Sequence, residues 1–308
     1  MASKSNEVQE KGMTEVKEEI SVVNNTPAPA GILVVIGGAE NKGQVAPEKK
    51  ETPNNFMGLE VLRTFVELTK KEDPIIEVIT SASSVGDESF SDYLKVFTEL
   101  GVTNIGHIHH VTRKEVLDNT IALIERIDNA DAVFFSGGDQ LLLTSLYGGS
   151  LMMKRLKERY IGEPIVVGGT SAGAMALSTP MIYAGSKEVQ ELAGEIKITT
   201  GLEFLKDVCI DTHFVHRGRF IRLAQVIATN PASIGIGIEE DTAIIVRQGT
   251  EGEIIGSGTI LVFEGYGITE TNIDEFGSKK PITVRNLNVH ILSKGDKYCF
   301  EHLNPPHL

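Results

Sequence analysis

A short run of small residues offers a serine as a nucleophile. Residues 169–173 read Gly-Thr-Ser-Ala-Gly, a GxSxG pentapeptide, which has chemical meaning where a strand precedes it and a helix follows. The apolar residues 165–167 and the helix-compatible sequence behind the pentapeptide fit that context. Glycines at such a sharp turn remove side-chain clashes and expose the hydroxyl, so we predict that Ser171 is a nucleophile. The alternative is that small residues only let a helix pack closely on a strand.

A serine needs a base, because its hydroxyl is not acidic enough to attack unaided. The chain has eight histidines, and residues 209–214 (CIDTHF) predict a strand that ends in a polar tip at His213. An α/β sheet places such tips at its ligand crevice, which makes His213 the best candidate. His216, three residues further on, is its nearest rival.

The acid that orients such a histidine should also follow a strand. Residues 235–241 (GIGIEED) place three carboxylates directly after an alternating Gly/Ile stretch. Alternation predicts that Glu239 and Glu240 point to opposite faces, so that one faces the site and the other is a solvated surface charge. The order Ser, His, Glu differs from the Ser, acid, His order of the α/β-hydrolases and excludes that family.

A second glycine pair lies in residues 134–140 (FFSGGDQ), where a predicted strand runs into a glycine-rich turn. This turn is a candidate source of a backbone N–H for an oxyanion hole. A phosphate loop is the competing use of such glycines, but no GxxxxGK[ST] or GxGxxG sequence follows a predicted strand. We therefore expect no nucleotide and no other cofactor.

Three further histidines, His107, His109 and His110, resemble a metal cluster. They fall on a predicted strand without a matching carboxylate nearby, which favours solvated or half-buried side chains over metal ligands. Cys209 and Cys299 are isolated and have neither a CxxC nor a Cys/His metal spacing. We expect no metal site and no disulfide framework.

The elements that position these residues alternate between strand and helix. Apolar runs predict strands at 32–36, 74–80, 105–111, 132–135 and 165–167, and helical spacing predicts helices at 56–68, 91–100, 116–127 and 141–159. Such alternation builds right-handed βαβ units. The predicted fold class is therefore α/β, with a doubly wound, mainly parallel sheet flanked by helices.

The two ends of the chain lack the alternation of strand and helix that is predicted for its middle. After Gly235 short strands are predicted at 243–247, 254–263 and 284–292, and we expect them to add antiparallel strands at the edge of the same sheet, towards the C-terminus. Residues 1–30 are polar and charged and end in a Pro/Ala stretch, which is typical of a disordered or loosely attached leader. We expect residues 31–308 to form a single α/β hydrolytic domain.

Composition narrows the possible partners and the location. The 29 basic and 42 acidic residues give a formal net charge of −13, and no stretch concentrates Lys and Arg, so nucleic acid and anionic membranes are not expected partners. Residues 1–20 lack the apolar core of a secretory signal, and no run approaches the roughly 18 apolar residues of a membrane span. We expect a cytoplasmic protein.

Five motifs, in this order, resemble those of the cyanophycinases, a family of serine peptidases that also holds the α-aspartyl dipeptidases. They are VIGGAE at 35–40, FFSGGDQ at 134–140, GGTSAGAMALS at 168–178, DTHFVHRGRFIRL at 211–223 and GIGIEEDTAI at 235–244. The resemblance implies that Ser171 is the nucleophile, His213 the general acid/base and Glu240 the group that orients the imidazole. It also implies an oxyanion hole made by the backbone N–H groups of Gly138 and Ala172.

The same resemblance implies a substrate pocket beside the histidine. Its residues would be Gln140, Asp211, Thr212, Arg217, Arg219 and Arg222. Guanidinium groups bind carboxylates in a bidentate manner, and Asp211 could engage a substrate guanidinium or amine. We expect at least one of the three arginines to be only a surface charge. Thr212 stands where the family has glutamine, and threonine is shorter and lacks the amide donor.

The function implied by the resemblance is the hydrolysis of cyanophycin, a poly-aspartate chain that carries arginine on its side-chain carboxylates. A Ser-His-Glu triad would release β-Asp-Arg dipeptides through an acyl-enzyme, and the family forms homodimers. The alternative within hydrolases is an α-aspartyl dipeptidase that acts on short N-terminal Asp peptides. An amidotransferase-like or non-catalytic binding module is the alternative from another class, but such amidotransferases have a cysteine where Ser171 stands.

Overall fold

The computed structural model describes residues 28–42, 59–185, 190–275 and 277–300. The predicted leader lies outside this part of the chain except for residues 28–30, and so does the start of the helix predicted at 56–68. The prediction of a single domain stays a prediction.

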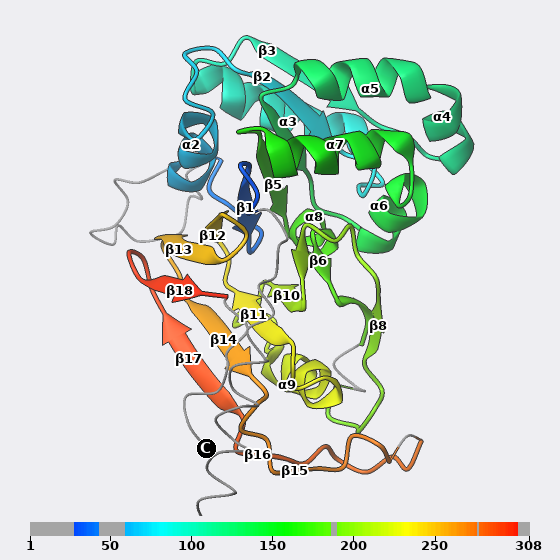
Figure 1. Ribbon diagram of the computed structural model, residues 1–308, viewed down its shortest axis with the longest axis vertical. Coiled ribbons are helices and arrows are strands. Elements are labelled where there is room, and N and C mark those ends of the chain that lie inside the picture. The colour runs from blue at the N-terminus through cyan, green and yellow to red at the C-terminus, as the bar shows by residue number, and fades with distance from the viewer. Residues whose placement is uncertain (1–27, 43–58, 186–189, 276, 301–308) are drawn as a thin grey trace, which may run out of the picture.

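Strands of the described chain form one large sheet with a parallel half and an antiparallel half (Figure 1). In spatial order its eight strands are β18 (Lys297–Cys299), β13 (Glu251–Gly256), β12 (Thr242–Arg247), β1 (Ile32–Ile36), β5 (Val166–Thr170), β4 (Ala132–Phe135), β2 (Ile75–Ile79) and β3 (Asn104–Ile108). Strands β1, β5, β4, β2 and β3 are mutually parallel, whereas β12, β13 and β18 pair antiparallel. The predicted fold class is confirmed.

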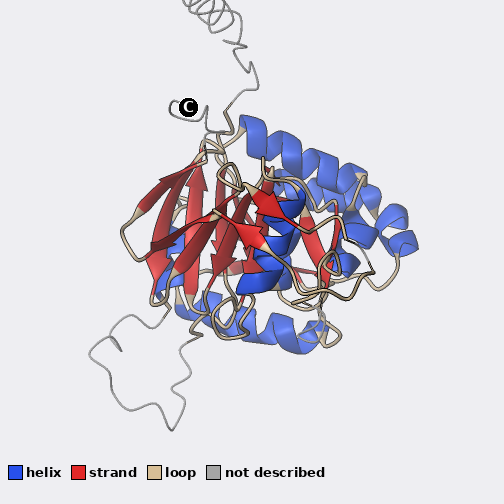
Figure 2. Ribbon diagram, turned by 90° about the horizontal axis from the view of Figure 1, so that it is seen from below, coloured by secondary structure: helices blue, strands red, loops and turns tan. Residues whose placement is uncertain are grey.

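Helices cover both faces of the parallel half, because its strands are apolar on both sides (Figure 2). In β1, Val34 and Ile36 pack in the same cluster as residues of α2 (Glu60–Glu67) and α3 (Gly86–Glu99). Leu33 and Val35 point to the opposite cluster. Among the helices that contribute to that second cluster are α4 (Arg113–Asp118), α5 (Thr120–Asn129), α6 (Gln140–Tyr147) and α7 (Leu151–Gly162).

A second sheet lies below the first in Figure 1, next to α9 (Phe220–Thr229). Its strands, in spatial order, are β17 (Asn288–Leu292), β14 (Ile260–Glu264), β11 (Ile234–Ile238), β10 (Val208–Thr212), β6 (Ser178–Thr179) and β9 (Leu205–Lys206). The prediction that all late strands extend the first sheet was therefore wrong for β14 and β17. The predicted strand 254–263 divides at Gly256, whose φ of +98° turns the chain from one sheet into the other.

Two short ribbons complete the strands of the described chain. They pair β15 (Glu270–Thr271) with β16 (Val284–Arg285), and β7 (Met181–Ala184) with β8 (Lys197–Thr199). No helix in the described ranges is long and apolar enough to cross a membrane.

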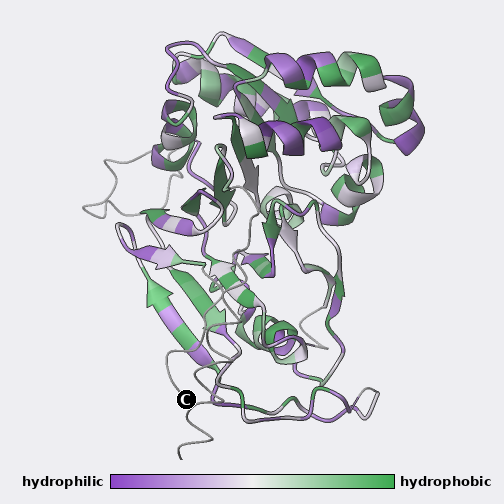
Figure 3. Ribbon diagram, viewed as in Figure 1, coloured by the Kyte–Doolittle hydropathy of each residue, from purple (hydrophilic) through white to green (hydrophobic). Residues whose placement is uncertain are grey.

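Two predicted helices are each broken into a pair by local capping. The predicted helix 141–159 divides at Gly148 and Gly149, and the hydroxyl of Ser150 then accepts from the Met153 N–H to begin α7. The predicted helix 116–127 begins earlier, at the Thr112 capping box, and divides at Asn119. Hydropathy colouring shows polar and apolar residues interleaved along these helices (Figure 3).

Register brings the ends of several strands to one place. Ile36 of β1 lies level with Thr170 of β5, and Phe135 of β4 lies level with Gly169. In the second sheet Thr212 of β10 lies level with Ile238 of β11. Because parallel strands end at the same edge, the residues that follow each pair are neighbours, and every sequence-predicted triad residue is among them.

Candidate active site

Ser171 lies in a strained turn between β5 and the short helix α8 (Ala172–Ala176). Its φ of 52° and ψ of −116° are rare for a residue with a side chain and cost about 1–3 kcal/mol. The Ser171 N–H donates to the Ile36 carbonyl at 3.1 Å, which fixes the turn to β1. A Cβ on Gly169 would lie 2.6 Å from the Gly173 carbonyl carbon, so the turn requires this glycine. The predicted strained turn is confirmed.

His213 and Glu240 meet Ser171 in a linear chain of hydrogen bonds. The Ser171 Oγ lies 2.9 Å from His213 Nε2, and His213 Nδ1 lies 2.6 Å from Glu240 Oε1. His213 is 7% exposed, and its backbone N–H donates to the Gly37 carbonyl at 2.8 Å. With Nδ1–H donating to the carboxylate, Nε2 is free to accept the serine proton. His216, the predicted rival, is exposed on the following loop.

Glu239 is not the solvated surface charge that the alternation predicted. Its Oε2 accepts hydrogen bonds from the Val215 N–H at 2.6 Å and from the His216 N–H at 3.1 Å. The carboxylate therefore holds the loop that follows His213. Neighbouring carboxylates at the end of β11 thus have different partners: Glu240 contacts the imidazole and Glu239 contacts the backbone beyond it.

The glycines after β1 form one wall of the site, which the sequence analysis did not assign. A Cβ on Gly38 would lie 2.4 Å from His213 Nε2, and a Cβ on Gly37 would lie 1.9 Å from the Glu239 carbonyl oxygen. Both positions therefore require glycine for close approach, and Gly38 also has a φ of +99°. The available signal was a glycine pair directly after a buried strand.

The glycine-rich turn after β4 lies against the serine. A Cβ on Gly137 would lie 3.3 Å from the Ser171 Cβ, and Gly138 has a φ of +141°. The Asp139 N–H donates to the Ala82 carbonyl at 2.8 Å, which anchors the turn to the loop after β2. Gly138 and Ala172 thus come from the two turns that meet at Ser171, and their oxyanion-hole role stays a prediction.

A buried ion cluster lies behind the histidine. The Asp211 carboxylate is 0% exposed and accepts from Arg222 Nε at 2.5 Å, from Arg222 Nη2, and from Arg219 Nη1 at 3.0 Å. Arg222 is 7% exposed, and Arg219 also donates to the Thr212 carbonyl at 2.7 Å. Burial lowers the pKa of Arg219 to about 10 against the opposing effect of Asp211, so it stays cationic at neutral pH. Two guanidinium groups on one carboxylate leave an excess positive charge, which suits an anionic group.

The remaining predicted pocket residues have different surroundings. Arg217 is exposed, as expected of at least one of the three arginines. Gln140 Nε2 donates to the Ile182 carbonyl at 2.7 Å, so this amide holds β7 beside the site. The Thr212 hydroxyl is buried and has no hydrogen-bond partner among the described residues.

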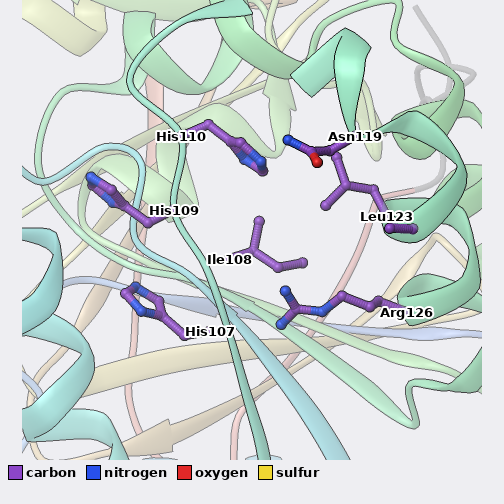
Figure 4. Close-up of a pocket in the computed structure, with 8 residues that line it drawn as sticks. His107, Ile108, His109, His110, Asn119, Leu123 and Arg126 are labelled. Atoms are coloured by element: carbon purple, nitrogen blue, oxygen red, sulfur yellow. The ribbon is translucent and has the colours of Figure 1, made fainter. Parts of the chain in front are cut away.

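The histidines near β3 are not part of this constellation. β3 ends at Ile108, so that His109 and His110 follow the strand, and all three histidines line a pocket with Asn119 and Arg126 (Figure 4). His107 Nε2 and His109 Nδ1 lie 2.7 and 3.0 Å from the Thr80 hydroxyl. All three side chains are half-buried, and no group of three or more His, Cys, Asp or Glu in the described ranges is arranged to hold a metal ion.

Comparison with known proteins gives a consistent family. The model of peptidase family S51 matches residues 51–254. The cyanophycinase of Geminocystis herdmanii is 32% identical over 270 residues, which cover 86% of this chain and 92% of that protein. The cyanophycinase of Trichormus variabilis is 30% identical over 266 residues, which cover 86% of this chain and 84% of that protein.

A solved structure shares the fold. The crystal structure of a peptidase from an acI-B1 actinobacterium matches with a TM-score of 0.61 at 19% identity, and the match covers 89% of this chain and 99% of that one. The resemblance stated from the five sequence motifs is confirmed by the family match and the relatives. The chain therefore belongs to peptidase family S51 and is a hydrolase of the peptidase type.

Proposed function

We propose that this chain is a serine peptidase that degrades cyanophycin to β-Asp-Arg dipeptides through Ser171, His213 and Glu240. The observation that carries the proposal is the continuous hydrogen-bond chain from the Ser171 hydroxyl through the imidazole to the Glu240 carboxylate. The cyanophycinase names of relatives at about 30% identity supply the substrate. Cytoplasmic location and a homodimer stay predictions.

The first half of the reaction forms an acyl-enzyme. Ser171 Oγ attacks the carbonyl carbon of a backbone amide between two aspartyl residues while His213 Nε2 takes the hydroxyl proton. Glu240 keeps the imidazole in the required tautomer and stabilises the imidazolium. The backbone N–H groups of Gly138 and Ala172 donate to the developing oxyanion. His213 then gives its proton to the leaving amine, and the C–N bond breaks.

The second half releases the dipeptide. Water attacks the ester carbonyl, His213 accepts a proton from that water, and the Ser171 oxygen leaves with this proton. The products are a new carboxylate and the regenerated hydroxyl, so that one water is consumed for each bond cleaved. A β-Asp-Arg unit carries carboxylates at both its aspartyl and its arginyl end, and Arg219 and Arg222 supply the positive charge beside the site.

Incubation of the purified protein with cyanophycin granules tests the proposal, with soluble products identified by mass spectrometry. We expect the wild type to release β-Asp-Arg and Ser171→Ala to release none while its circular dichroism spectrum and Tm stay unchanged. Residual turnover near the wild-type rate in Ser171→Ala would defeat the triad. If the polymer stays intact but a fluorophosphonate labels Ser171 and short Asp-Xaa peptides are cleaved, the chain is instead an aspartyl dipeptidase.

A further inference from the structure

The end of β1 and the loop after it contact each region of the proposed triad. The Ile36 carbonyl at the end of β1 accepts from the Ser171 N–H, and the Gly37 carbonyl of the loop accepts from the His213 N–H at 2.8 Å. The Gly38 carbonyl of the loop accepts from the N–H of Asp241, the residue after Glu240, at 3.0 Å. A single segment therefore sets the distances among three residues that come from different strands.

Glu40 is a charged side chain of this loop, and it is buried. It is 5% exposed, its Oε1 accepts from the Tyr93 hydroxyl at 2.5 Å, and its Oε2 accepts from the Thr170 hydroxyl. Thr170 directly precedes Ser171 and is 3% exposed. A carboxylate is costly to bury unless it is hydrogen-bonded, and here both oxygens accept from hydroxyls. Burial and the adjacent Glu40 carboxylate hold the pKa of Tyr93 well above its ordinary value, so its hydroxyl is a proton donor at neutral pH.

We propose that Glu40 is a positioning residue, which holds Thr170 and thereby keeps the strained Ser171 in reach of His213. A φ of 52° persists at Ser171 only if its surroundings fix it more firmly than the local backbone preference. The Ile36 carbonyl fixes the N–H of Ser171, and the Glu40 carboxylate fixes the side chain of the residue before it. Tyr93, from α3, in turn holds Glu40. This inference rests on the proposed nucleophile Ser171.

The alternative is that Glu40 only stabilises the fold by accepting from two buried hydroxyls. The two roles differ in what they do to the serine, because displacement of a reacting group by about 1 Å costs on the order of 100-fold in rate. A positioning role affects kcat and the reactivity of Ser171 in the folded enzyme. A purely stabilising role lowers Tm and leaves both unchanged.

The test compares four variants by kcat and KM for cyanophycin, by the rate at which a fluorophosphonate labels Ser171, and by Tm. Glu40→Ala removes the acceptor of both hydroxyls, and Thr170→Val removes only the hydroxyl next to the nucleophile. We expect each to lower kcat and the labelling rate at least about tenfold with KM within about twofold. Glu40→Gln keeps an acceptor oxygen and should recover most of both rates. The double variant should be no slower than the slower single variant, because both changes act through one contact.

Glu77 supplies a matched control on β2. It is also 5% exposed, but its carboxylate binds Arg126 rather than a residue of the site. Glu77→Ala should lower Tm and leave the labelling rate of the folded enzyme within about twofold of the wild type.

Three outcomes decide the matter. Wild-type labelling and kcat in Glu40→Ala, with a lowered Tm as in Glu77→Ala, would overturn the positioning role. If Glu40→Ala does not fold, wild-type labelling in Thr170→Val would overturn it equally. Full hydrolysis by Ser171→Ala would instead remove the proposed function, whatever the Glu40 variants do.

Discussion

Histidines follow strand ends in two regions of this molecule, and their surroundings differ in kind. His213 follows β10 and lies between a hydroxyl and a carboxylate. His109 and His110 follow β3, where the hydrogen-bond partners of their imidazoles are the hydroxyls of Thr80 and Tyr147. A carboxylate orients an imidazole and stabilises its charged form, whereas a hydroxyl supplies no charge.

The difference shows that the number of histidines is a poor signal of chemistry. The three histidines near β3 have hydroxyls as hydrogen-bond partners, and the Asp87 carboxylate lies 3.9 Å from His107 Nδ1. The single histidine between Thr212 and Phe214 instead has a carboxylate and the strained Ser171 at hydrogen-bond distance. What distinguishes His213 is the close approach of Gly38 to its Nε2 and the Glu240 carboxylate at its Nδ1. Parallel substitutions in the two regions can test this contrast.

The largest effect on kcat is expected when His213, and separately His110, is replaced by glutamine. His213→Gln removes the proposed base and should lower kcat on cyanophycin by about 10⁴-fold or more, since members of such a unit act together. His110→Gln should keep kcat within about threefold, because the His110 imidazole bonds the Tyr147 hydroxyl and lines the pocket near β3. Steady-state kinetics of both variants at equal folded concentration provide the measurement. Similar losses in both would break the contrast.

A smaller effect is expected from the two neighbouring glutamates. Glu240→Gln keeps the shape but removes the charge that supports the imidazolium, and kcat should fall on the order of 10³-fold. Glu239→Gln still offers a carbonyl oxygen to the two backbone N–H groups of its loop, so its loss should stay within about tenfold. Comparable losses would mean that the loop, and not the charge on the imidazole, limits the reaction.

Substitution of Arg219 and of Arg217, which lie in the same segment, should affect substrate binding to different extents. Arg219 is half-buried beside Asp211, and Arg219→Ala should raise KM about tenfold, which corresponds to one charge-assisted contact. Arg217 is exposed, and Arg217→Ala should change KM by less than about twofold. An unchanged KM in Arg219→Ala would show that this guanidinium only neutralises Asp211.

That Ser171, His213 and a carboxylate of residues 239–241 meet could be predicted from the sequence because each follows an apolar strand, whereas the choice of Glu240 came from the resemblance to the family. Parallel strands end at one edge of the sheet, so polar residues that follow several such strands must lie close together at that edge. The role of Asp211 was less accessible. Its carboxylate forms ion pairs with Arg219 and Arg222, and these contacts depend on the turn from β10 into α9 rather than on any local pattern.

The second sheet was missed for a related reason. Strand periodicity gives the face of a residue but not the sheet to which a strand belongs. The signal was Gly256, where a Cβ would lie 2.2 Å from the Asp241 carbonyl oxygen and where the φ is positive. Breaks in the predicted helices at Gly148 and Asn119 were of the same kind, because capping residues end a helix whose apolar periodicity continues.

The smallest effect is expected in the pH dependence of stability, and it belongs to the region near β3. Burial lowers the pKa of His107 and of His110 below the ordinary 6.5, an effect that His109 and Arg126 strengthen and that Asp87 and Glu115 oppose. At a pH between the lowered pKa values of the folded chain and 6.5, these two histidines bind more protons in the unfolded chain than in the folded chain. Stability from these groups is therefore present above about pH 6.5 and is lost as the pH falls.

The double variant His107→Gln/His110→Gln measures this contribution, because glutamine keeps a polar side chain and does not titrate. Its Tm should fall less than that of the wild type between about pH 7.5 and about pH 5.5, since the penalty for protonating two half-buried imidazoles is gone. The difference between the fall in Tm of the variant and that of the wild type removes the contribution of every other titrating group to a first approximation. Equal falls would mean that the imidazoles near β3 are protonated as easily in the folded chain as in the unfolded one, and a smaller fall in the wild type would reverse the sign of the effect.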